Sequence, residues 1–244
     1  YQYKVARRDG KLIHCETIPA GDGTVLVETE RTIDLSVGSG QHAKSYLFRE
    51  GDYFGQSPLT WFEAEGDWRM SPGYEGLYQP SFRRKIRSEC VFCHVGSVDT
   101  KDLNPYQFEI VETTIGCERC HGPGELHVAK YKNQSDVDID DRTIVNPANV
   151  PRELAEAICQ QCHLQGVNWV TTTGHDIWDF RPGLPIQDVR VDYQLTEASG
   201  NMRIVGHVEQ MHASECYKQS EVLSCVTCHD PHRPVPRDQR IEHH

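Results

Sequence analysis

The pentapeptide Cys90-Val91-Phe92-Cys93-His94 decides how this chain folds, because its pattern occurs four times. The other copies are Cys117-Glu118-Arg119-Cys120-His121, Cys159-Gln160-Gln161-Cys162-His163 and Cys225-Val226-Thr227-Cys228-His229. C-x-x-C-H is the attachment signature of c-type haem, in which two thiols bind the porphyrin covalently and the histidine binds the iron. The sequence therefore predicts four covalently bound haem c groups, attached through Cys90, Cys93, Cys117, Cys120, Cys159, Cys162, Cys225 and Cys228, with proximal iron ligands His94, His121, His163 and His229.

Other uses of paired cysteines explain this pattern less well. A structural zinc site needs two C-x-x-C pairs that converge on one metal, and it needs no histidine after each second cysteine. A disulfide framework would not account for the four histidines. A thioredoxin-like motif occurs near a βαβ pattern, which is not evident around these four.

The composition agrees with a fold that depends on its cofactor. Apolar residues make up 37% of the 244 residues, below the usual ~45–50% of globular domains. Four porphyrins would supply apolar surface that the side chains lack, so we expect folding to be coupled to haem attachment, as folding of a metal-dependent domain is coupled to its metal.

The first 80 residues contain no haem motif and show β patterns. Runs at 24–29 and 32–37 predict strands, Glu50-Gly51 predicts a hairpin between 45–49 and 52–54, and 59–62 predicts one more short strand. Farther along, 151–159 predicts a helix that runs into the third motif. We expect an α+β protein, with a small N-terminal β-rich region at 1–80 followed by a mainly helical, loop-rich tetrahaem cytochrome c domain at 81–244.

Each haem iron has a second axial position, and nine histidines lie outside the motifs against three methionines (Met70, Met202 and Met211). This ratio favours bis-histidine, low-potential haems. His42 follows a glycine-rich break that lets the backbone approach a haem, and either His207 or His212 is expected to serve the region before the fourth motif, with His207 preferred. His212, His175 and His14 are the alternatives. His243 and His244 are excluded as a tail or tag.

Several segments resemble multihaem c-type cytochromes related to the tetrahaem cytochrome that accepts electrons from hydroxylamine oxidoreductase. The resemblance rests on 116–127 with its Gly122-Pro123-Gly124 and on 225–232, and it extends to parts of 38–47, 180–183 and 214–217. In that family the histidine after C-H-G-P-G and the histidine that closes C-H-D-P-H are distal iron ligands. The resemblance therefore implies His127 and His232 as distal ligands.

Charge and hydropathy limit the partners. Residues 90–244 carry 13 basic and 23 acidic side chains, a net charge of −10. This acidity argues against nucleic acid and favours redox proteins with a basic docking site. No run of 18 apolar residues predicts a membrane span. Because haem c is attached outside the prokaryotic cytoplasm, we expect a periplasmic, cell-surface or extracellular location.

Three functions fit these features. The first is electron transfer through closely packed haems, without catalysis on a substrate. The second is a subunit of an extracellular cytochrome filament, in which His14 or the unused member of His207 and His212 ligates a haem of the next copy. The third is a multihaem nitrite or hydroxylamine oxidoreductase with an open haem, although no motif visibly lacks a candidate histidine for its distal position.

Cys15 and Cys216 remain outside the motifs and could form a disulfide.

Overall fold

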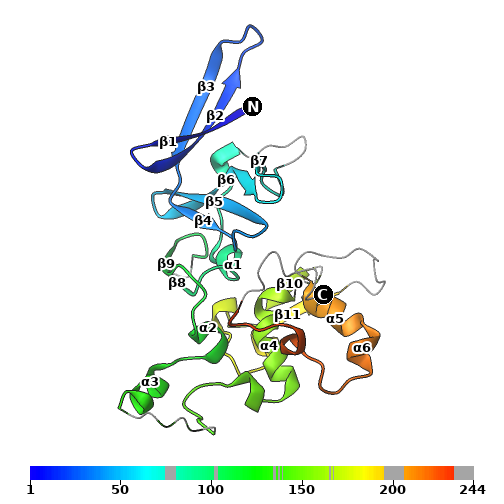
Figure 1. Cartoon of the computed structure of the whole chain (residues 1–244). Coiled ribbons are helices and arrows are strands. Elements are labelled where there is room, and N and C mark those ends of the chain that lie inside the picture. Colours follow the sequence, from blue (N-terminus) through cyan, green and yellow to red (C-terminus); the bar gives the residue numbers. More distant parts are fainter. Residues whose placement is uncertain are drawn as a thin grey trace. The chain divides into compact units, whose positions relative to one another are not determined.

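The computed structural model describes residues 1–74, 81–101, 104–133, 136, 138, 140–164, 166, 168–194 and 206–233. Met202, His243 and His244 lie outside these residues. The chain forms two compact units, Tyr1–Ile115 and Gly116–His244. Each unit is described by itself below (Figure 1). No helix in the described part of the chain is long and apolar enough to cross a membrane.

The first unit begins with a three-stranded antiparallel sheet of β1 (Gln2–Arg8), β2 (Lys11–Pro19) and β3 (Val25–Thr32). Asp9 and Gly10 connect β1 to β2, both with positive φ, as a two-residue hairpin turn requires. β3 confirms the strand predicted at 24–29. The sequence analysis did not predict β1 and β2, although Asp-Gly between them is a hairpin signal.

A second antiparallel sheet contains β4 (Leu35–Val37), β5 (Ala43–Glu50), β6 (Tyr53–Phe62) and β7 (Asp67–Met70). The hairpin predicted at Glu50-Gly51 joins β5 to β6. The strand predicted at 59–62 is confirmed, but it is not separate from the strand at 52–54, because β6 runs unbroken from Tyr53 to Phe62. Its Ser57 and Pro58 are buried, so the strand continues through them inside the sheet.

The rest of the first unit packs on β6. It contains the 3-10 helix η1 (Ser81–Arg83), helix α1 (Ser88–Val91) and the hairpin of β8 (Ser97–Thr100) and β9 (Phe108–Glu112). Phe108 packs on Phe54 with ring centroids 5.3 Å apart, and Arg49 donates to Glu109 at 2.8 and 2.5 Å. These contacts explain why the compact unit continues past residue 80 to Ile115 and includes the first haem motif.

In its described residues, the second unit contains short helices and one two-stranded antiparallel sheet. Its α-helices are α2 (Glu118–His121), α3 (Glu125–Tyr131), α4 (Arg152–His163), α5 (His207–Ala213), α6 (Glu215–Lys218) and α7 (Cys225–Cys228). The 3-10 turns are η2 (Pro147–Asn149), η3 (Ile177–Asp179) and η4 (Ile186–Asp188), and β10 (Asn168–Thr171) pairs with β11 (Arg190–Tyr193). Strands and helices together confirm the α+β class.

Helix α4 is the longest of the helices described and confirms the helix predicted at 151–159. Pro151 is its N-cap, and the helix extends through the third haem motif to His163. Its buried face includes Ala157, which forms a small core with Phe180, Ile186 and Val189. The Arg190 guanidinium caps its C-terminal end, since Nη2 donates to the Leu164 carbonyl at 2.6 Å and Nη1 to the Gln161 carbonyl at 3.2 Å. The small core and the Arg190 bonds thereby fix the third motif in place.

Candidate haem-binding site

The first motif lies in the first unit, at the end of α1. Its two middle residues, Val91 and Phe92, are buried, whereas Cys90 and Cys93 are exposed. His94 lines a hollow of about 380 Å³ together with Leu35, Val37, Gly38 and Ile110, among other residues. The buried pair anchors the motif in the unit, and Cys93 and His94 line the hollow where a haem could attach.

In the sequence, His42 is close to residues that line this hollow. Gly38 and Ser39, which begin the loop to His42, line the hollow beside His94. Gly38 has φ +123°, and an added Cβ there would lie 2.6 Å from the Ala43 carbonyl oxygen, so only glycine fits. The expected distal ligand and the first proximal histidine thus belong to the same unit.

The second motif pairs its histidine with His232. The rings of His121 and His232 have centroids 5.9 Å apart and planes within 10° of each other. Nδ1 of His121 lies 2.7 Å from the Val145 carbonyl oxygen; a carbonyl only accepts, so Nδ1 carries the proton and Nε2 remains available to a metal. Metal-binding histidines are commonly oriented by such a bond.

The third motif pairs its histidine with His207. Their ring centroids lie 5.0 Å apart with planes within 13°. The pKa of His163 is lowered, first by partial loss of hydration and then by the neighbouring His207 and His229. His229 belongs to the fourth motif, so the histidines of the third and fourth motifs lie close together.

The second, third and fourth motifs meet in the second unit. A hydrogen bond between the Cys159 and Cys225 thiols raises the pKa of Cys159, burial raises it further, and Cys120 adds to the effect. Gln161, a middle residue of the third motif, donates to the carbonyl of Arg119, a middle residue of the second, at 3.1 Å. One attachment thiol from each of these three motifs is therefore near the others.

His127 lies on α3, with its side chain 37% exposed. Its Nδ1 lies 2.7 Å from Asp141 Oδ2, so this nitrogen is a donor and Nε2 is left for a metal. Asp141 is held in turn by Thr143 and Lys130. Thr143 is the first of the groups that keep the pKa of the Asp141 carboxyl well below its usual range. The sequence analysis missed Asp141, which only the folded loop brings to His127.

The three alternative ligands are placed differently. His14 is fully buried, with Nδ1 2.6 Å from Ser57 Oγ, so it could reach an iron of this or another copy only if the sheet opened. His212 directs Nε2 to Glu156 Oε2 at 2.9 Å. His175 is about half exposed, 3.5 Å from the Asp179 carboxylate.

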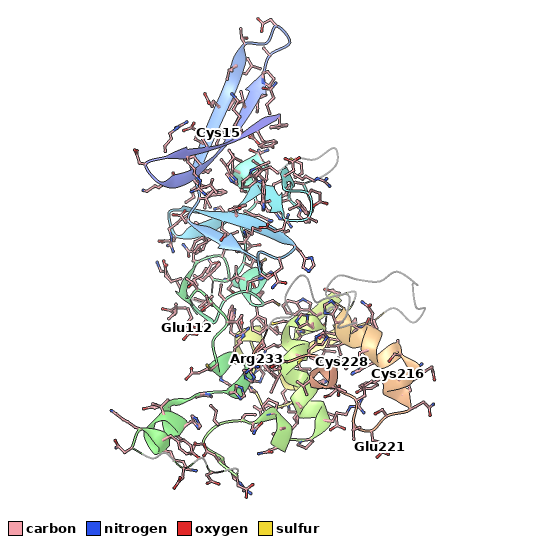
Figure 2. The ribbon with its side chains drawn as sticks, viewed as in Figure 1. Cys15, Glu112, Cys216, Glu221, Cys228 and Arg233 are labelled. Atoms are coloured by element: carbon pink, nitrogen blue, oxygen red, sulfur yellow. The ribbon has the colours of Figure 1, made fainter. Side chains whose placement is uncertain are left out.

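Of the two cysteines outside the motifs, Cys15 belongs to the first unit and Cys216 to the second, so a disulfide between them stays a prediction. Cys15 is buried in β2 and donates to Glu30 Oε1 at 3.3 Å, and Cys216 is exposed on α6 (Figure 2). The bond to Glu30 gives the Cys15 thiol a partner within its own sheet.

The residues present fit haem as a ligand. Nε2 of His121 and of His127 is free of the bond that orients each ring. Large apolar side chains are exposed beside these histidines and motifs, including Leu126 (68%), Val128 (63%) and Val226 (56%). Exposed apolar side chains grouped around a site mark a binding surface, as attachment of a porphyrin would require.

Comparison with known proteins supports the same class. The family described as cytochrome c554 and c-prime matches residues 74–122, a stretch that includes the first two motifs. Together with the four motifs, this match supports a multihaem c-type cytochrome with covalently bound haem c. The outer cell wall cytochrome OcwA is a similar solved structure, at 21% identity over 62% of this chain and 30% of that chain, with a TM-score of 0.39. The chain thus spans less than a third of OcwA. No curated protein sequence matches it.

Proposed function

We propose that this chain is a tetrahaem c-type cytochrome that carries electrons between protein partners outside the cytoplasm. The observation that carries the proposal is the pairing of His121 with His232 and of His163 with His207. Two imidazoles that share one metal have ring centres about 6 Å apart, since each metal–nitrogen bond is about 2 Å long. The His121–His232 centroids, 5.9 Å apart, match that separation, and the His163–His207 centroids, 5.0 Å apart, are about 1 Å closer. Both pairs have almost parallel rings.

The proposal assigns a distal ligand to three motifs. His232 serves the second motif, His207 the third and His42 the first, the last because the His42 loop borders the hollow that His94 lines. His127 is the fourth distal ligand, because Asp141 fixes its Nδ1. We choose His207 over His212 because Nε2 of His212 donates to Glu156. His14 and His175 are left out of the ligand set.

Electron transfer follows from this ligand set. When bound, haem supplies a one-electron carrier whose potential is kept low by two histidine ligands. The contacts among Cys120, Cys159 and Cys225 support close packing of three of the haems. An iron with two histidine ligands has no open position for a substrate, which favours a carrier over a nitrite or hydroxylamine oxidoreductase.

The location follows from cofactor chemistry, since haem c is attached outside the prokaryotic cytoplasm. Whether the chain is periplasmic or on the cell surface depends on its partners. A filament of this chain would keep the carrier role and make a second copy one of those partners.

The mass of the intact holoprotein tests the haem count. The proposal predicts a mass that exceeds the polypeptide mass by four haems. Replacing both cysteines of any one of the four motifs by alanine should remove one haem and leave three. An increment of three or fewer haems in the unsubstituted protein would contradict the proposal.

A further inference from the structure

Helix α4 has a buried carboxylate, Glu156, that lies outside the proposed ligand set. Glu156 is 3% exposed, and both of its oxygens are occupied. Oε1 accepts from Arg152 Nε at 3.0 Å, whereas Oε2 accepts from His212 Nε2 at 2.9 Å and from Tyr217 Oη at 3.0 Å. Arg152 also lies over the Tyr217 ring, 3.8 Å from its centroid.

Burial of this carboxylate is not explained by helix formation. Acidic residues stabilise the first turn of a helix through its dipole without being buried, and the neighbouring Glu153 is exposed on the same helix. A buried carboxylate loses hydration that only good hydrogen bonds replace. Its three donors therefore indicate a role in holding separate elements together.

The elements held are those that present a proposed axial pair. α4 ends at His163, α5 begins at His207, and His212 is near the end of α5. A second contact joins the same two regions: the Gly166 backbone N–H donates to Glu209 Oε1 at 2.7 Å. α5 is thus attached at two points to α4 and to the residues just after it.

We propose that Glu156 is a positioning residue that fixes α5 on α4 through His212, so that His207 stays opposite His163. The inference rests on the bis-histidine ligation proposed above. Arg152 balances the charge of Glu156, and Tyr217 ties α6 into the same network. His212, the alternative ligand of the sequence analysis, then orients the helix that carries His207.

Glu156 and Cys159 are three residues apart on α4, so their side chains are neighbours and the Glu156 charge lies close to one proposed haem attachment point. A negative charge near a haem stabilises the oxidised iron. Loss of this charge should raise the reduction potential of the adjacent haem.

The test compares Glu156→Gln with Glu153→Gln in the holoprotein. Glu153 lies on the same helix but is exposed, so its substitution changes the same charge without breaking the network. We expect the reduced Glu156→Gln protein to bind about one CO per chain, because one iron loses His207 as a ligand and its haem becomes open. The reduction potential of the adjacent haem should also rise. Glu153→Gln should bind none. Equal CO binding by both variants, or by neither, would overturn the inference.

Two further variants decide the question if Glu156→Gln does not fold. His212→Phe removes the bond to α5 and keeps a ring on Tyr217, so it should also bind CO. Tyr217→Phe removes only the bond to α6 and should not. A His212→Phe protein without CO binding would overturn the inference.

CO binding by the unsubstituted protein distinguishes a failure of the bis-histidine proposal from a failure of the role proposed for Glu156. If it binds CO rapidly at several haems, the bis-histidine proposal itself fails. If neither it nor the Glu156→Gln and His212→Phe variants bind CO, only the positioning role of Glu156 fails.

Discussion

His121 and His232 are the best-defined proposed axial pair. The Val145 carbonyl fixes the ring of His121, and the two rings lie nearly parallel. The 5.9 Å between their ring centroids is close to the separation of two imidazoles that share one metal.

Replacing His232 by alanine should leave one iron without its distal ligand. We expect one of the four haems to change from low spin to high spin, measured by electron paramagnetic resonance, with the other three unchanged. His175→Ala is the matched control, since His175 is exposed and lies outside the proposed ligand set. A His232→Ala spectrum identical to that of the unsubstituted protein would remove the assignment.

Asp141 should tune the haem that His127 ligates. Its carboxylate accepts the Nδ1 proton of His127 at 2.7 Å, and such a bond makes a ligating imidazole a stronger donor. Asp141→Asn weakens this bond, so we expect the potential of one haem to rise in a redox titration. Asp138→Asn is the control, since Asp138 accepts from Lys130 Nζ, whereas His127 Nδ1 bonds to Asp141. Identical potentials in both variants would argue against His127 as a ligand.

At the scale of elements, the contact between β2 and β6 contains a buried histidine. His14 lies edge-on to Tyr46 and Trp68, with ring centroids 5.1 Å apart in both cases, and burial lowers its pKa to about 4. An unfolded histidine has a pKa of about 6.5. The unfolded chain thus binds more protons between these values, and the first unit should lose stability as the pH falls from about 6.5 to 4, by roughly 3 kcal/mol at most.

Hydrogen exchange of β2 and β6 in the holoprotein measures this loss. Exchange protection should fall at pH 5 relative to pH 7, after correction for intrinsic rates, and His14→Gln should remove most of the difference. His175→Gln, at an exposed position outside the proposed ligand set, should leave it in place. A pH response that persists in His14→Gln would show that another group is responsible.

How much the sequence reveals differs between elements. The α4 prediction was right because Pro151, acidic residues and the third motif mark one helix in continuous sequence. β1 and β2 were missed because these strands are half polar and are stabilised by their place in a sheet that covers His14. The burial of Glu156 had no local signal, since its neighbour one helical turn away, Gln160, is also polar. The carbonyl of Val145 and the carboxylate of Asp141 carry no such local signal, because only the folded loops bring them to histidines.

At the scale of the whole molecule, charge should govern encounters with partners. Residues 116–244 carry 12 basic and 19 acidic side chains, a net charge of −7 before any haem propionate is added. Opposite charge on a partner accelerates association, and salt screens the effect because the Debye length falls from about 30 Å at 0.01 M to 3 Å at 1 M.

Reduction of the holoprotein by a basic redox protein should therefore slow by roughly tenfold or more over that range of ionic strength, measured by stopped-flow absorbance. A neutral small-molecule reductant is the control and should show little dependence on salt. Partner kinetics that ignore ionic strength would contradict the electrostatic part of the account, though not the carrier role.

Electron paramagnetic resonance of the oxidised holoprotein, with spins counted against haem content, tests the central claim most directly. The proposed ligand set predicts that low-spin signals account for all or nearly all of four haems per chain, since each iron has two histidine ligands. A dominant high-spin signal would contradict this result, because it would reveal open haems and favour an oxidoreductase over an electron carrier.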